Sequence, residues 1–204
     1  MSDSNCLIII MCKAPVEGKV KTRLMTQYTA AEAMAWHKAM ATTVIERAKH
    51  LFQDVWLAVD DIKHPFFSPF KLPLYIQGEG DLGARMTKLM TQASQAGFKN
   101  ILFLGTDSPH MPDERLLHAV LALDEYDVVL GAVEDGGYDL IAMNNAYSTL
   151  FSGIRWSSEH VLKKTLAITK SQGLSYLVLE ESFDVDTPEM LDRARQAGWN
   201  TLTK

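Results

Sequence analysis

The stretch at residues 101–109, ILFLGTDSP, constrains the fold more than any other part of this 204-residue sequence. Its four apolar residues, 101–104, form a short unbroken run, which is typical of a strand buried on both faces in a largely parallel sheet. Gly105 then permits a turn, so Asp107 stands just beyond the carboxyl end of that strand. Ligands of open α/β sheets bind at that end. We expect Asp107 either to hold a divalent cation over a phosphate or only to cap the turn into the next helix.

The composition indicates a single globular domain. Hydrophobic residues make up 47% and charged residues 22% of the chain, which is ordinary for a globular protein. No apolar run approaches the roughly 20 residues that cross a bilayer, and the N-terminus lacks the basic segment of a signal peptide. The net charge of −5 argues against a nucleic-acid surface. We therefore expect a cytoplasmic protein without nucleic-acid or membrane partners.

Strand and helix patterns alternate along the whole chain. Strands are predicted at residues 6–11, 54–59, 74–76, 101–104, 127–133, 139–143 and 176–179. Helices are predicted at residues 30–52, 84–96, 113–123 and 158–170, and from residue 188 onward. Three helix starts carry capping signals, namely Thr29 with Glu32, Ser157 or Ser158, and Thr187 with Pro188. This alternation predicts one α/β domain over residues 1–204.

A basic loop follows the first strand. Residues 13–23 contain four cations, Lys13, Lys19, Lys21 and Arg23, and a single anion. Their spacing is neither that of a Walker A loop nor GxGxxG. Cations beside backbone amides suit a polyphosphate, although a merely solvated basic loop remains the alternative.

Two glycine-containing segments are further candidates for ligand contact. In QGEGDLGARM, residues 77–86, Gln77 is placed to pair with a base edge or ribose and Arg85 to reach a phosphate, unless this is only a flexible turn before a helix. In EDGGYD, residues 134–139, the glycine pair predicts a hairpin turn and also leaves space for a ligand on the sheet. Asp135 lies in that turn, and Tyr138 is placed to stack on a ring.

A late acidic pair completes the set of candidates. Asp184 and Asp186 flank Val185, and in an extended segment their side chains point the same way. Together with Asp107 they would close a divalent-metal site.

The motifs taken together resemble a known family. KAPVEGKVKTRL, QGEGDLGARM, LGTDSP, EDGGYDLIAM, IRWSSEHVLKKT and FDVDTP occur in this order and cover nearly the whole chain. They resemble bacterial glycosyltransferase-like proteins of the nucleotide-diphospho-sugar transferase superfamily, some of which accompany radical-SAM and arsenosugar-type pathways. The pattern is more distantly similar to phospholactate and molybdenum-cofactor guanylyltransferases. Asp139 and Ser158 depart from the family pattern, the first in a way that bears on acceptor choice.

The resemblance implies a fold, a cofactor and a set of site residues. The fold is a single-domain GT-A, Rossmann-like three-layer sandwich with a mostly parallel mixed sheet, and the cofactor is Mg²⁺ or Mn²⁺. The residues assigned to nucleotide binding are Lys13, Gly18, Lys21, Thr22, Arg23, Gln77, Gly83, Arg85 and Thr106. Those assigned to the acceptor are Gly136, Gly137, Tyr138 and Trp156. Asp107 and one of Asp184 and Asp186 would hold the metal, and Asp107 and Asp135 are the candidate catalytic residues.

Three functions remain open at this point. The first is metal-dependent glycosyl transfer from a nucleotide-sugar to a small acceptor, with Asp135 as a candidate base. The second is nucleotidyl transfer from a nucleoside triphosphate to a small phosphorylated acceptor. The third is nucleotide binding without turnover, which loss of the carboxylates would favour, yet all three are present.

Overall fold

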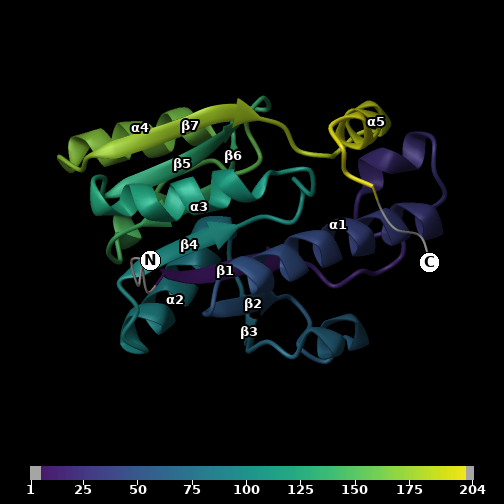
Figure 1. The fold of residues 1–204 in the computed structure, drawn as a ribbon, viewed down its shortest axis with the longest axis horizontal. Helices are drawn as coiled ribbons and strands as arrows, with labels where there is room; N and C mark the ends of the chain where they lie inside the picture. Colours follow the sequence, from purple (N-terminus) through teal and green to yellow (C-terminus); the bar gives the residue numbers. More distant parts are fainter. Residues whose placement is uncertain (1–5, 201–204) are drawn as a thin grey trace.

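A seven-stranded mixed sheet forms the centre of the molecule (Figure 1). The computed structural model describes residues 6–200. The strands are β1 (Cys6–Cys12), β2 (Val55–Val59), β3 (Leu74–Ile76), β4 (Asn100–Leu104), β5 (Val128–Val133), β6 (Tyr138–Met143) and β7 (Tyr176–Ser182), in the order β3-β2-β1-β4-β6-β5-β7. Only β6 runs antiparallel to its neighbours, β4 and β5. The predicted mostly parallel mixed sheet is therefore confirmed.

Residues 6–200 contain five α-helices. They are α1 (Ala30–Leu51), α2 (Leu82–Gln95), α3 (Asp113–Leu121), α4 (Val161–Ser171) and α5 (Pro188–Gln196), with short 3-10 turns η1 (Thr22–Thr26), η2 (Pro65–Phe70), η3 (Ala122–Asp124) and η4 (Ser148–Phe151) between them. None of the helices within residues 6–200 is both long enough and apolar enough to span a bilayer.

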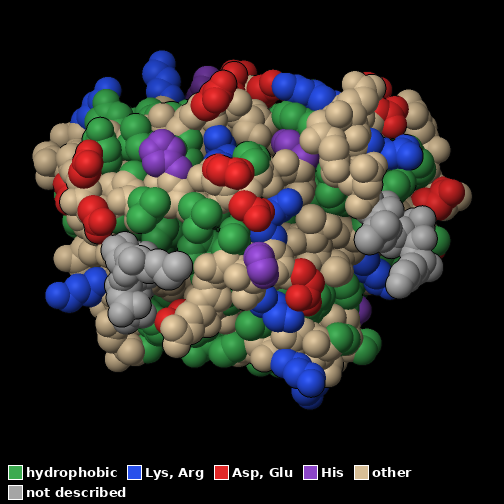
Figure 2. Space-filling view, viewed as in Figure 1, with side chains coloured by type: hydrophobic (Ala, Val, Ile, Leu, Met, Phe, Trp, Pro, Cys, Tyr) green, Lys and Arg blue, Asp and Glu red, His purple; other side chains and the backbone are tan. Residues whose placement is uncertain are grey.

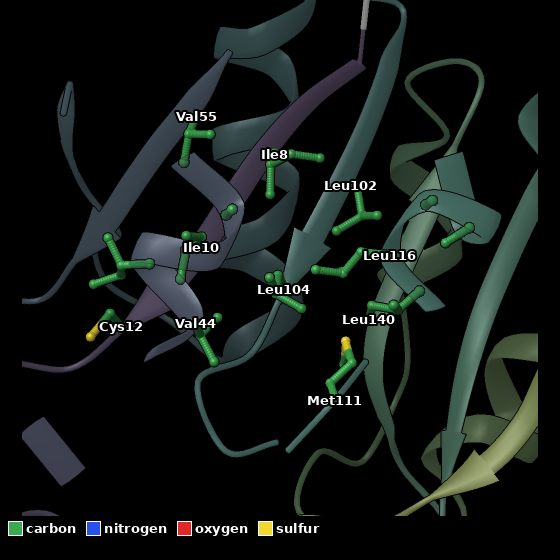
Figure 3. Packing of buried hydrophobic residues seen from close by; sticks show 14 of the residues in the cluster. Ile8, Ile10, Cys12, Val44, Val55, Leu102, Leu104, Met111, Leu116 and Leu140 are labelled. Carbon is green, nitrogen blue, oxygen red and sulfur yellow. The ribbon is translucent and has the colours of Figure 1, made fainter. Parts of the chain in front are cut away.

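Two apolar layers, one on each face of the sheet, make up most of the core. On one face, residues such as Ile8, Ile10 and Leu104 pack against α1 and α3, through Val44 and Leu116 among others (Figure 3). On the other face, alternate residues of the same strands pack against α2, α4 and η4. The strands are nearly continuous apolar runs because both of their faces are buried. The architecture is the expected three-layer α/β sandwich.

A third, smaller cluster lies at the edge of the sheet where β1 and β4 end. There α5 packs against η1 and the first half of α1, through buried residues that include Leu24, Met40 and Leu191. Figure 1 shows α5 beside η1, separated from the rest of the late chain. This cluster brings the acidic segment before α5 close to the basic loop after β1.

Two of the three predicted helix caps are confirmed. Thr29 and Glu32 form a reciprocal capping box at the start of α1, and the Thr187 side chain accepts from the Met190 amide with Pro188 at the first helical position. The third is wrong. Helix α4 begins at Val161, its N-cap residue is His160 without a side-chain cap bond, and Ser158 instead donates its hydroxyl to the Arg155 carbonyl.

The charged surface is mixed. On the face that carries α1 and α3, acidic and basic side chains are interspersed (Figure 2).

Candidate functional site

A pocket of about 700 Å³ opens where β1 and β4 end. It is lined by Met11, Lys13, Lys19, Val20, Lys21, Thr22, Arg23, His37, Gln77, Gly80, Asp81, Leu82, Arg85, Gly105, Thr106, Asp107, Trp156, Ser157 and Asp186. The basic loop, the segment after β3, the turn after β4 and the acidic segment before α5 thus meet in one place. These four segments are widely separated in the sequence, between Met11 and Asp186. The strands that precede them are parallel, so the carboxyl ends of these strands share one edge of the sheet and bring the segments together.

The basic loop is anchored at its N-terminal end by two partly buried polar contacts. The amide of Ala14 donates to Asp60 Oδ1 at 2.6 Å. His37 on α1 is 5% exposed, and its Nε2 lies 2.9 Å from the Lys13 carbonyl oxygen. Burial lowers the pKa of His37, so a neutral ring donates this hydrogen bond. His37 thus lines the pocket and fixes the loop.

Two carboxylates face one ammonium group inside the pocket. Lys21 Nζ lies 2.8 Å from Asp107 Oδ1 and 3.0 Å from Asp186 Oδ1, and Arg23 bonds to the other oxygen of Asp186 at 2.9 Å. Burial alone lowers the pKa of Lys21, but the two carboxylates outweigh it and raise that pKa. Burial likewise raises the pKa of Asp107, but Lys21 outweighs it and lowers that pKa. Lys21 and Asp107 are therefore both charged near neutral pH.

Asp184 does not join this pair. The Asp186 amide donates to the Asp184 carbonyl at 3.2 Å, which bends the chain in a three-residue turn. The expectation that the two side chains point the same way is therefore wrong. Asp184 accepts from the Ser108 hydroxyl at 2.6 Å, and burial followed by the nearby Asp107 charge raises its pKa to about 7. Asp184 and Ser108 fasten the turn after β4 to the chain before α5, as does the Val185 amide, which donates to the Asp107 carbonyl.

Gln77 and Arg85 also line the pocket. The Gln77 side chain is 4% exposed, donates to the Ala58 carbonyl at 2.8 Å and accepts from Arg85 at 3.3 Å. Its hydrogen bonds therefore hold Arg85 rather than leaving its amide free for a base. Gly83 lies outside the lining. A Cβ at Gly83 would meet the Phe151 carbonyl at 2.6 Å, so this glycine lets α2 pack closely against η4.

The predicted acceptor residues divide into two groups. Trp156 lines the pocket beside Ser157, whose φ of 57° is unusual for a residue with a side chain. Asp135, Gly136, Gly137 and Tyr138 form the β5–β6 hairpin turn outside the lining. The Tyr138 ring lies against Trp156 in the core, with centroids 6.5 Å apart, and Asp135 Oδ1 accepts from the Gly137 amide. The space at Gly136 is taken by the Glu159 backbone, so close packing explains this glycine.

Asp139 has a structural explanation as well. Its side chain is 2% exposed and pairs with Arg115 of α3 at 3.2 Å. The departure from the family pattern at this position therefore provides a buried partner for Arg115 on the face opposite Tyr138.

Of the remaining nucleotide-binding candidates, Lys13, Thr22 and Thr106 line the pocket and Gly18 does not. Sequence reasoning passed over Asp81, Leu82 and Ser157 in the lining. Asp81 and Leu82 lie within the QGEGDLGARM motif, and their place in this motif was the feature of the sequence that could have identified them as pocket residues.

The two carboxylates Asp107 and Asp186 fit a divalent cation in one respect. The ammonium of Lys21 stands between Asp107 and Asp186 as a cation bound by both. Within the described range, 6–200, no group of three or more His, Cys, Asp and Glu side chains converges as metal ligands would. Two carboxylates of this chain thus fit the ion, and other ligands would have to come from bound molecules.

Several solved structures are similar to this chain over most of its length. A protein of Desulfovibrio desulfuricans G20 described as a "putative nucleotide-diphospho-sugar transferase" is 29% identical, with a TM-score of 0.84 over 89% of this chain and 82% of that one. CMP:2-keto-3-deoxy-manno-octonic acid synthetase complexed with CTP has 14% identity and a TM-score of 0.62 over 94% and 97% of the two chains. The 4-diphosphocytidyl-2C-methyl-D-erythritol synthase of Anaerococcus prevotii DSM 20548 has 11% identity and a TM-score of 0.60 over 93% and 95%. The last two concern the fold alone.

These similarities confirm the fold that the sequence motifs predict and the likeness to nucleotide-diphospho-sugar transferases. No curated protein matches the chain. A family model described as "Uncharacterized protein conserved in bacteria (DUF2064)" matches residues 42–158, more than half of the sequence. The chain belongs to the DUF2064 family of bacterial proteins.

Proposed function

We propose that this protein is a metal-dependent transferase that uses a nucleotide-sugar as donor and transfers the sugar to a small acceptor. One observation carries the proposal, namely that five cationic side chains line a single pocket at the carboxyl ends of β1 and β4 together with the Asp107–Asp186 pair of carboxylates. The cations are Lys13, Lys19, Lys21, Arg23 and Arg85. The likeness to the Desulfovibrio protein supports the nucleotide-sugar.

The basic loop would bind the diphosphate of the donor. Lys13 and Lys19 are exposed, and Arg85 is held in place by Gln77. Fixed cations at a departing diphosphate stabilise the negative charge that develops as the bond to the sugar breaks. His37 would keep the Lys13 backbone in position while this happens.

Asp107 and Asp186 would hold Mg²⁺ or Mn²⁺. When bound, such an ion neutralises phosphate oxygens and orients them. Trp156 and Ser157, which also line the pocket, would contact the acceptor. Asp135 lies in the hairpin turn outside the lining, and its role as a base remains a prediction.

A second candidate is nucleotidyl transfer, in which an acceptor phosphate attacks the α-phosphorus of a nucleoside triphosphate and pyrophosphate leaves. The number of cations in the pocket favours it, because a triphosphate carries more charge than the diphosphate of a nucleotide-sugar. The acceptor phosphate is already ionised, so this reaction requires no general base.

A thermal-shift screen of nucleoside triphosphates and nucleotide-sugars, each with Mg²⁺, Mn²⁺ or EDTA, tests the proposal. A ligand at 100 times its dissociation constant stabilises the fold by about 2.7 kcal/mol, which for a chain of this length raises Tm by roughly 5–10 °C. Asp107→Asn should abolish the metal-dependent part of the shift. Asp192→Asn, which changes an exposed carboxylate on α5, is the matched control.

The products separate the two reactions. Phosphorus NMR of a turnover mixture would show a nucleoside diphosphate after glycosyl transfer and pyrophosphate after nucleotidyl transfer. Binding without either product would favour a non-catalytic nucleotide-binding protein. An unchanged metal-dependent shift in Asp107→Asn would contradict the assignment of the site.

A further inference from the structure

The ammonium group of Lys21 is saturated with hydrogen-bond acceptors. Its three N–H groups face Asp107 Oδ1 at 2.8 Å, Asp186 Oδ1 at 3.0 Å and the Val185 carbonyl oxygen at 2.8 Å. A lysine ammonium has three donors and no more. Lys21 therefore cannot donate to a phosphate while these three bonds persist.

The same ammonium occupies the position that a cation shared by the two carboxylates would take. The Lys21 side chain is 5% exposed, whereas those of Asp107 and Asp186 are 44% and 36% exposed. Mg²⁺ binds its oxygen ligands at about 2.0–2.1 Å, closer than the ammonium nitrogen lies to either carboxylate. The two cations exclude each other from the shared oxygens for steric and electrostatic reasons.

The local charge is balanced without any ligand. Lys21 and Arg23 carry two positive charges, and Asp107 and Asp186 carry two negative charges. A divalent ion arriving alone would have to displace a buried ammonium from both of its carboxylate partners. A polyphosphate removes this obstacle, because its oxygens accept the donors that Lys21 and Arg23 withdraw from the carboxylates.

The backbone at Lys21 supports a side chain that can leave. Lys21 has φ 46° and ψ 42°, a left-handed conformation, and stands as the N-cap residue of η1 without a side-chain cap bond. Such strained residues concentrate at ligand clamps and switch regions.

We propose that Lys21 is a displaceable internal cation that closes the Asp107–Asp186 pair to free divalent ions until a polyphosphate binds. This inference rests on the proposed function and adds an order of binding to it. Since coupling between two ligands is reciprocal, the polyphosphate and the metal each strengthen the binding of the other. Lys21 thereby makes the metal site conditional on the nucleotide.

The test is a titration with Mn²⁺ alone, followed by electron paramagnetic resonance and by calorimetry, on the full chain without nucleotide. Lys21→Met should bind Mn²⁺ at least about tenfold more tightly than the wild type, since the competing ammonium is gone. Lys19→Met is the matched control. It removes the same charge from the pocket, but the wild-type Lys19 side chain lines the pocket without an ion pair to either carboxylate among the residues described.

Further variants make the test independent of one substitution. Lys21→Gln keeps two N–H donors. If Lys21→Met does not fold, the Mn²⁺ affinity of Lys21→Gln is compared with that of the wild type instead. Adding Asp186→Asn to either should abolish the gain. Equal Mn²⁺ affinity in wild type, Lys21→Met and Lys19→Met would overturn the inference, and so would a gain that survives Asp186→Asn.

Nucleotide binding to the wild type, measured in parallel with Mn²⁺ and with EDTA, separates the two proposals. Equal Mn²⁺ affinities alongside normal nucleotide binding overturn the role of Lys21 alone. Absence of nucleotide binding under every metal condition overturns the proposed function, whatever the Mn²⁺ titration gives.

Discussion

At the scale of the residue, Gly136 has a steric requirement that its place in a hairpin turn does not reveal. Its φ is +84°, and a Cβ would lie 2.1 Å from the Glu159 carbonyl oxygen. A Cβ at Gly153, whose φ is +67°, would have no other atom within 4 Å. Both glycines avoid backbone strain, but only Gly136 also avoids a collision between the hairpin and the chain that leads into α4.

Gly136→Ala should therefore destabilise the protein more than Gly153→Ala. Backbone strain costs each variant about 1–2 kcal/mol, and overpacking adds roughly 1–3 kcal/mol at position 136. Urea unfolding of both variants measures the difference. Equal losses would mean that the hairpin moves away from Glu159 without cost.

At the scale of the element, one buried arginine joins α3 to three strands. Arg115 pairs with Asp139 of β6 and donates to the Ala132 and Glu180 carbonyl oxygens of β5 and β7. The pair lies where β5 carries a register shift after Gly131, and a Cβ at Gly131 would meet Asp139 at 2.1 Å. Gly131, in the irregular part of β5, therefore leaves the space in which the Asp139 side chain pairs with Arg115.

Arg115→Met should cost about 2–4 kcal/mol at pH 8, because it leaves Asp139 buried without its partner. The cost should be smaller at pH 5. Burial already raises the pKa of Asp139 to about 6 against the attraction of Arg115, and without Arg115 this pKa rises further. In Arg115→Met the folded state then binds the Asp139 proton more tightly than the unfolded state does. The stability of this variant therefore falls as the pH rises toward the raised pKa of Asp139.

Chemical denaturation of Arg115→Met at pH 5 and pH 8 measures this effect. Arg195→Met, which changes an exposed arginine on α5, should lose little at either pH. A cost that does not depend on pH would show that Asp139 stays ionised without Arg115.

At the scale of the whole molecule, local charge opposes net charge. The chain carries −5 overall, yet the pocket is lined by five cationic side chains against three carboxylates, those of Asp81, Asp107 and Asp186. The interspersed charges of the face in Figure 2 create no comparable concentration of one sign. Attraction of a polyanion therefore depends on the pocket and not on the total charge of the protein.

Affinity for a nucleoside triphosphate should fall about tenfold when the salt concentration rises from roughly 0.05 to 0.5 M, because the Debye length shrinks below the pocket dimensions. Calorimetry at both salt concentrations measures the change. The uncharged nucleoside of the same base is the control and should show little salt dependence. The same dependence for both ligands would argue that the phosphates do not lie among the pocket cations.

Local sequence patterns were sufficient for the elements and for much of the site. The apolar runs that became β1 and β4, the Thr29–Glu32 capping box, the basic loop and Asp107 could all be predicted, because each depends on near neighbours in the chain and on the rule that parallel strands present ligands at their carboxyl ends. The prediction of Ser157 or Ser158 as the cap of α4 was wrong, since no periodicity in the sequence separates the irregular turn that contains Ser158 from the helix that begins at Val161.

Only the tertiary structure decided how distant side chains use their hydrogen bonds. The sequence alone determined that Lys21, Asp184 and Asp186 carry charges that suit a phosphate or a metal. It did not determine that Lys21 would bind both Asp107 and Asp186, that a three-residue turn would direct Asp184 to Ser108, or that Gln77 would hold Arg85. These partners lie far apart along the chain, and packing of α5 against η1 brings several of them together. Which donor meets which acceptor follows from that packing.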